Sequence, residues 1–305
     1  MMRRLRSNED GQAIMLSVVF LVLLLGATAL TIDVGAWYRA QRAAQGTADA
    51  AALAGAQALP NDTPTASTLA AQYATVNGGG VAPSDISFRS EWQPNDTVVV
   101  KVKRTTPSFF ARLFSISSVD VSATAAARAG TPEAVRGVGP IVVNKLQTEL
   151  SGPGCPCFHV ETTLPLGKDG APGAFGLVNL DPGSNNGVPN LAGWIQYGFD
   201  GYLPLGRYNS DPGAKFNSDN IISALNARLA TELLLPVYDT LTGNGANAQY
   251  NVIGWVAFHL DSFDPGNGNN SSLTGYFTRV IWNGLQSTTN KHLPDFGVYS
   301  VSLVN

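Results

Sequence analysis

The sequence predicts an α+β protein with a long N-terminal helix, a small α/β module and a larger β-rich domain. An uncharged apolar run covers residues 13–32, and an alanine-rich pattern continues it to residue 59. The rest of the chain alternates short apolar segments with Gly-, Pro- and Asn-rich turns. Only 13% of the 305 residues are charged, while 44% are hydrophobic, a balance that favours folded, turn-rich structure over disorder.

The run at residues 13–32 has the length of a membrane-spanning helix. As a helix it would rise about 30 Å, the thickness of a bilayer's hydrocarbon core. Arg3, Arg4 and Arg6 precede it. Because positive residues stay on the cytoplasmic side, we expect a single-pass protein of the cytoplasmic (inner) membrane. Residues 1–12 would form a cytoplasmic tail, and the C-terminal domains would lie outside.

Two cleaved alternatives remain for this run. Ala27-Thr28-Ala29 has the small-x-small pattern of a signal-peptidase site, although no polar segment precedes it. A type IV prepilin would be cut after Gly11 and would carry Glu at the fifth mature position, where this chain has Leu16. The sequence favours an uncleaved anchor, and each reading exports the rest of the chain.

Residues 33–59 continue the helix until Pro60 ends it. Small side chains recur along this stretch at steps of three or four residues. Such a stripe lets a neighbouring helix or sheet approach closely, and we expect it to pack on the chain's own next module rather than on a partner helix. The stripe comprises Ala36, Ala40, Ala43, Thr47, Ala50, Ala54 and Ala58.

A set of residues around the apolar run has a family pattern. A Gly-Gln pair precedes the run, an Asp-x-Gly triplet follows it, and an alanine-rich segment of the form Q-x-x-A-D-A-A-A-L-A-G-A comes next. In this order and spacing, residues 11–59 resemble the TadE/TadG-like family of Flp (tight-adherence) pilus-assembly proteins. The residues that carry the motif are Gly11, Gln12, Asp33, Gly35, Asp49, Leu53 and Gly55.

The resemblance implies a non-enzymatic membrane protein that helps to build or anchor an adhesive pilus. Its partners would be the membrane and pilus or secretion-machinery proteins. Some family members carry a von Willebrand A-type domain with an Asp-x-Ser-x-Ser metal motif. Here the segment 85–89 ends in Arg89, so that domain is not expected.

The module that follows, up to residue 129, is predicted from short patterns. We expect a helix over 65–77, a hairpin of 86–92 with 97–104, a helical turn within 108–114 and a strand over 119–129. Residues 130–139 are predicted to be a linker.

Residues 140–305 are predicted to form a barrel- or sandwich-like β domain with helices inserted at 191–197 and 220–233. The expected strands are 141–143, 158–164, 175–180, 250–260, 276–282 and 298–304.

Candidate chemistry is sparse. There is no nucleophile elbow, no phosphate-binding loop and no dinucleotide fingerprint, so we expect no catalytic residue, no cofactor and no metal. A net charge of −3 gives no sign of nucleic-acid binding. Cys155 and Cys157 are expected to form a local disulfide outside the cytoplasm, although with His159 they could instead offer three metal ligands.

The alternative function is a membrane-tethered binding module for a carbohydrate or cell-wall polymer. Trp194, Tyr197, Tyr202 and Trp255 could stack on sugar rings, although packing in the core explains such residues more simply. A cluster of them in one open groove would favour that function.

Overall fold

The computed structural model describes residues 9–167, 174–181, 187–267, 270–286 and 293–304. The chain divides into two compact units. The N-terminal unit comprises Met1–Arg128 with Leu303–Asn305, and the C-terminal unit comprises Ala129–Ser302.

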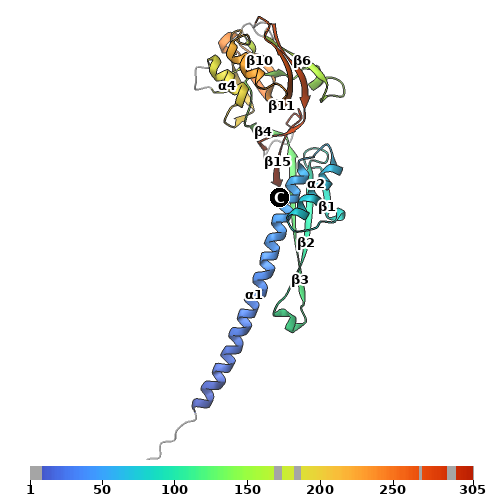
Figure 1. Cartoon of the computed structure of the whole chain (residues 1–305), viewed down its shortest axis with the longest axis vertical. Helices are drawn as coiled ribbons and strands as arrows, with labels where there is room; N and C mark the ends of the chain where they lie inside the picture. Colours follow the sequence, from blue (N-terminus) through green and yellow to red (C-terminus); the bar gives the residue numbers. More distant parts are fainter. Residues whose placement is uncertain (1–8, 168–173, 182–186, 268–269, 287–292, 305) are drawn as a thin grey trace, which may run out of the picture. The chain divides into compact units, whose positions relative to one another are not determined.

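The N-terminal unit begins with α1 (Glu9–Ala56), one continuous helix of 48 residues (Figure 1). Its first part is apolar on all sides, with large side chains exposed from Ile14 to Leu25. From Asp33 onward small side chains replace them, and burial becomes one-sided. The helix is long and apolar enough to cross a membrane, and it extends beyond the apolar run as predicted.

A second helix and a sheet pack on the later part of α1. Asp62 caps the second helix by accepting a hydrogen bond from the backbone N–H of Thr65, at 2.9 Å. The elements are α2 (Thr63–Val76), η1 (Pro83–Asp85), β1 (Ile86–Arg89), β2 (Thr97–Pro107), η2 (Ala111–Phe114) and β3 (Ser118–Gly130).

The predicted hairpin of β1 and β2 is confirmed, with Ile86 opposite Val100. Val100 and its neighbours two residues away on β2 are fully buried, whereas Lys101 and Lys103 face solvent. This two-residue period places one face of the sheet against α1. The β2–β3 hairpin is long, and η2 lies at its tip (Figure 1).

The C-terminal unit is built on a half-barrel sheet whose path runs β5-β10-β11-β12-β6, with β7 and β9 joined to it through β11. A smaller sheet has the order β14-β4-β8. The strands are β4 (Pro132–Val135), β5 (Val143–Asn144), β6 (Glu161–Gly167), β7 (Ala174–Val178), β8 (Leu203–Pro204), β9 (Gly206–Pro212), β10 (Glu232–Thr242), β11 (Gln249–Asp264), β12 (Asn270–Thr278), β13 (Val280–Ile281), β14 (Gly284–Gln286) and β15 (Val298–Val304). The helices are α3 (Thr148–Ser151), α4 (Val188–Tyr197), α5 (Asp219–Asn226) and η3 (Gly245–Asn247).

Both faces of the central strand β11 are buried. Phe258 belongs to a core that also contains side chains of α4 and α5, while Trp255 and Ala257 belong to a second core on the other side. A strand buried on both faces carries a nearly continuous apolar run, as this one does from Val252 to Leu260 apart from His259.

Several sequence predictions differ from the structure. The helix expected over 220–233 ends at Asn226, and Glu232–Thr242 forms strand β10. Pro236 would break a helix there, and burial on both faces lets the leucine run form a strand. Residues 130–139, expected to be a linker, contain β4. The polar strand β9 was not predicted, because its pairing partners rather than its own composition hold it in the sheet.

Candidate functional site

Asp33, the first residue after the apolar run, binds the turn between β2 and β3. We call residues 108–117 the tip segment. The Asp33 carboxylate accepts three backbone hydrogen bonds from it: from Phe109 at 2.7 Å, from Phe110 at 3.0 Å and from Ala111 at 2.6 Å. Only 2% of Asp33 is exposed. The carboxylate satisfies the free N–H groups at the start of η2, which fixes the tip segment against α1.

Thr47 connects α1 to both neighbouring elements. Its hydroxyl lies 2.9 Å from the carbonyl oxygen of Asn77, the residue that caps the C-terminus of α2. It also accepts a hydrogen bond from Arg104 Nη2 on β2 at 2.7 Å. The same Nη2 atom donates to the Asn77 carbonyl at 3.1 Å. One polar cluster therefore joins α1, α2 and β2.

Gly55 allows the closest approach of α1 to α2. A Cβ atom placed on it would lie 3.0 Å from the carbonyl oxygen of Ala66 and 3.2 Å from the Cβ of Ala70. Those distances are tighter than ordinary van der Waals contacts. The glycine in the family motif thus has a packing role.

The predicted small-residue stripe is only partly in the packed face. Thr47 and Ala54 are buried, Ala43 is exposed, and the others are half-buried. The buried face is centred about one residue further along the chain, which is about 100° around the helix. Its fully buried members include Ala44, Ala48, Ala51, Ala52 and Ala56.

The remaining motif residues lie along α1. Gly11 and Gln12 belong to its first turns. Asp49 accepts a hydrogen bond from Gln45 Nε2 at 2.7 Å and is half-buried, as are Gly35 and Leu53. The structure therefore brings Asp33 to the tip segment and Gly55 to α2, whereas Asp49 makes a bond within the helix.

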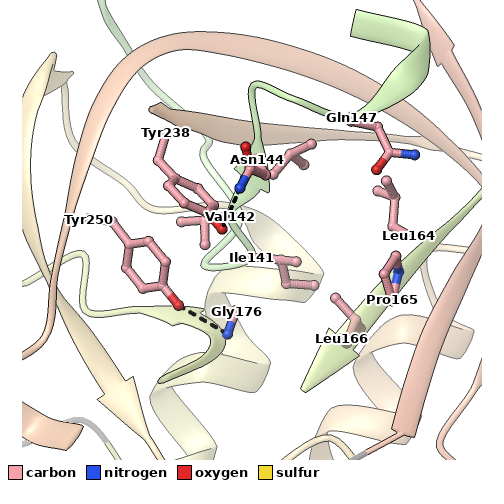
Figure 2. A pocket seen from close by; sticks show the side chains of 11 residues that line it. Ile141, Val142, Asn144, Gln147, Leu164, Pro165, Leu166, Gly176, Tyr238 and Tyr250 are labelled. Carbon is pink, nitrogen blue, oxygen red and sulfur yellow. Dashed lines mark hydrogen bonds between the residues drawn. The ribbon is translucent and has the colours of Figure 1, made fainter. Parts of the chain in front are cut away.

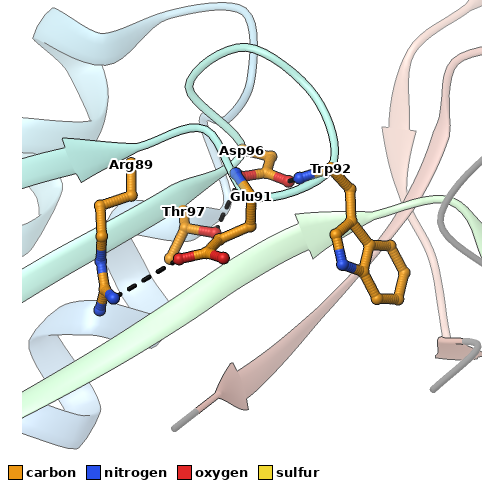
Figure 3. Close-up of polar contacts among 5 residues, drawn as sticks. All are labelled: Arg89, Glu91, Trp92, Asp96 and Thr97. Carbon is orange, nitrogen blue, oxygen red and sulfur yellow. Dashed lines mark hydrogen bonds and ion pairs between the residues drawn. The ribbon is translucent and has the colours of Figure 1, made fainter. Parts of the chain in front are cut away.

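A second buried carboxylate organises the loop between β1 and β2 (Figure 3). Asp96 accepts backbone hydrogen bonds from Glu91, Trp92 and Gln93 at 2.9, 2.8 and 3.1 Å. The Trp92 ring lies 3.6 Å below the guanidinium carbon of Arg128 on β3. These contacts order the loop and make Asp96 a structural residue.

In the C-terminal unit, Cys155 and Cys157 are joined by a disulfide. Their thiolates are therefore not free to bind a metal with His159, whose ring packs 5.3 Å from that of Tyr276. The His259 ring stacks on the same Tyr276 ring, with ring centroids 4.7 Å apart. In the described parts of the chain, no group of three His, Cys, Asp or Glu side chains is arranged to hold a metal ion.

A cavity of about 50 Å³ lies among β5, β6 and the paired strands β10 and β11 (Figure 2). Asn144 Nδ2 donates to the Tyr238 hydroxyl at 3.2 Å, and the Gly176 N–H donates to the Tyr250 hydroxyl at 3.2 Å. Pockets that bind small molecules usually reach about 300 Å³ or more. This cavity has room for water rather than for a sugar or cofactor.

The aromatic residues considered for sugar binding have different environments. Trp255 is 3% exposed and lies in the core, so its ring is not available to a ligand. Trp194 is half-buried and makes an edge contact with Phe199. Tyr197 and Tyr202 are exposed, and the Tyr202 hydroxyl donates to Asn283 at 2.9 Å.

Tyr208 is a structural phenol. Its hydroxyl donates to the carbonyl oxygen of Pro204 at 2.5 Å, and burial raises the pKa of Tyr208 to about 12. The group stays protonated at neutral pH and keeps this hydrogen bond.

A comparison with known proteins finds a family match in the N-terminal helix. Residues 11–58 match the Tad family model, described as Flp pilus-assembly TadE/G-like. No curated protein and no solved structure matches the chain. The matched residues include Asp33, Thr47 and Gly55, the positions at which α1 holds the tip segment, the polar cluster and α2. The predicted resemblance is confirmed for this region: residues 11–58 are similar to the TadE/G-like Flp pilus-assembly family.

Proposed function

We propose that this protein is a non-enzymatic, single-pass component of the Flp pilus-assembly apparatus in the cytoplasmic (inner) membrane. Residues 1–12 form the cytoplasmic tail and residues 13–32 the transmembrane segment. The module of residues 33–129 and the domain of residues 140–305 lie outside, where they meet pilus or secretion-machinery proteins.

The strongest support for this proposal is that the family match and the long helix cover the same residues. The family match over residues 11–58 coincides with the helix that contains the apolar run and its packed continuation. Asp33 marks the change between them, because it is the first charged residue after the run and is held by three hydrogen bonds. The same helix can therefore anchor the protein and position the exported module.

Topology is tested by adding protease to spheroplasts that contain the full-length protein. With the N-terminus inside, we expect a protected fragment that ends near Asp33 and digestion of residues 60–305. Mass spectrometry of the membrane fraction identifies the fragment. A mature protein that begins after Ala29 and is free of the membrane would contradict the anchor.

The pilus role is tested by deleting the gene and restoring it in the source cells. We expect the deletion to abolish surface pili and the intact gene to restore them. An Asp33→Ala variant should restore few pili, whereas Asp120→Ala, which removes an exposed carboxylate of the same unit, should restore them fully. Normal piliation in the deletion strain would rule out this role.

A further inference from the structure

The tip segment exposes a group of large apolar side chains. Isolated exposed apolar residues are common, but five within eight residues mark a contact surface. The exposed fractions are 62% for Phe109, 41% for Phe110, 82% for Leu113, 80% for Phe114 and 47% for Ile116.

This surface lies beside the membrane-spanning part of α1. A groove of about 550 Å³ separates the tip segment from the helix, and its α1 wall extends from Val22 to Trp37. Phe110, Leu113 and Phe114 form the opposite wall. Val22 lies about 16 Å before Asp33 along the helix axis, roughly the depth of one leaflet.

We propose that the tip segment is a second membrane contact, in which Phe109, Leu113 and Phe114 enter the acyl-chain region of the leaflet at the Asp33 end of α1. Lipid chains fill the groove. This inference rests on α1 crossing the membrane, as proposed above, but not on the pilus role.

The backbone of the tip segment is suited to this environment. An N–H group without a partner is costly where water is absent. Here the N–H groups of Phe109, Phe110 and Ala111 donate to Asp33. Four other N–H groups of the tip segment donate to carbonyl oxygens within the same segment. The donors are the backbone N–H groups of Ser108, Leu113, Ser115 and Ile116.

Side chains near the tip segment mark the edge of the bilayer. Trp37 and Tyr38 follow Asp33 by about one helical turn, and such amphipathic rings collect at membrane–water interfaces. Arg112 is exposed on η2, and its long side chain can reach lipid phosphates. A tip segment held at Asp33 therefore lies at the depth of about 5–10 Å that interfacial apolar groups occupy.

The test uses the full-length protein in vesicles of phosphatidylcholine and phosphatidylglycerol. Three cysteine variants carry an environment-sensitive fluorophore: Phe114→Cys in the tip segment, Ser17→Cys in the apolar run and Ser87→Cys on exposed β1. Without reductant, the disulfide keeps Cys155 and Cys157 unlabelled. Quenching is measured with iodide in the water and with nitroxide groups on lipid acyl chains.

The label at residue 114 should behave like that at residue 17, with quenching by the lipid nitroxide and loss of quenching by iodide. The label at residue 87 should be quenched by iodide and not by the lipid nitroxide. Quenching of residue 114 by iodide would overturn the proposal, and shielding from both quenchers would overturn it in favour of a protein partner. A Leu113→Cys variant repeats the measurement. If the label at residue 17 is itself open to iodide, α1 does not span the membrane and the anchor fails as well.

Discussion

The two units are stabilised by cores of opposite kinds. In the N-terminal unit the buried side chains of α1 and α2 are mostly alanines, packed against valines of β2. In the C-terminal unit the largest fully buried side chains include Tyr250, Phe216, Phe258 and Phe277. A core of small side chains is sensitive to added volume, whereas a core of large side chains is sensitive to its loss.

This difference also bears on function. Small side chains bring the backbone of α1 close to its neighbours, so the helix that carries the apolar run packs tightly against α2 and β2. The C-terminal core instead supports a broad sheet with long strands. The family match lies in the first kind of core and ends before the second.

The largest expected effect is the loss of a buried ring from the C-terminal unit. Phe258 is fully buried and makes an edge contact with Phe277, with ring centroids 5.3 Å apart. Phe258→Ala should destabilise this unit by about 3–5 kcal/mol, because it leaves a cavity. Hydrogen exchange followed by mass spectrometry, on the full-length protein in detergent micelles, measures each unit separately.

The matched control is Tyr197→Ala, which removes a ring that is 78% exposed. It should change stability by less than about 0.5 kcal/mol. If Phe258→Ala left the protection of β10–β12 unchanged, the large-residue core would not limit the stability of this unit.

An added side chain should have the next largest effect, in the N-terminal unit. Ala54 is 3% exposed, so Ala54→Leu should destabilise that unit by about 1–3 kcal/mol through overpacking. Ala43→Leu places the same side chain on an exposed position of the same helix and should be nearly neutral. Equal effects of the two variants would show that the packed face of α1 is misplaced.

How well the sequence predicts each segment depends on how clearly its apolar and polar residues are separated. The apolar run and the β1–β2 hairpin could be predicted, because charge-free length and alternation are strong signals. The packed face of α1 could be predicted only to within about one residue, since alanines occur on neighbouring sides of the helix and differ little from one another. The predicted end of the helix at residue 233 was wrong, because Leu233 and its neighbours suit either a helix or a buried strand.

The candidate site was only partly predictable. Asp33 and Gly55 were found through the family motif, but their contacts depend on residues distant in the sequence. The N–H groups that Asp33 binds are about 76 positions away. The sequence shows that the tip segment contains apolar residues, but only the structure places them beside the apolar run.

The smallest expected effect is a pH dependence that should appear in each unit separately. A side-chain hydrogen bond from Asn251 is the main cause that holds the pKa of Asp239 below its usual value, and one from Thr65 does so for Asp62. A lowered folded-state pKa gives stability that is present above the unfolded pKa of about 4 and is lost as the pH falls through the folded value. Asp239→Asn should therefore flatten the acid side of the stability profile in the C-terminal unit only, and Asp62→Asn in the N-terminal unit only. Hydrogen exchange after equilibration between about pH 2 and pH 6, corrected for intrinsic exchange rates, measures both profiles at once. A single variant that flattened both profiles would show that the two units unfold together, and their cores could then no longer be treated as independent.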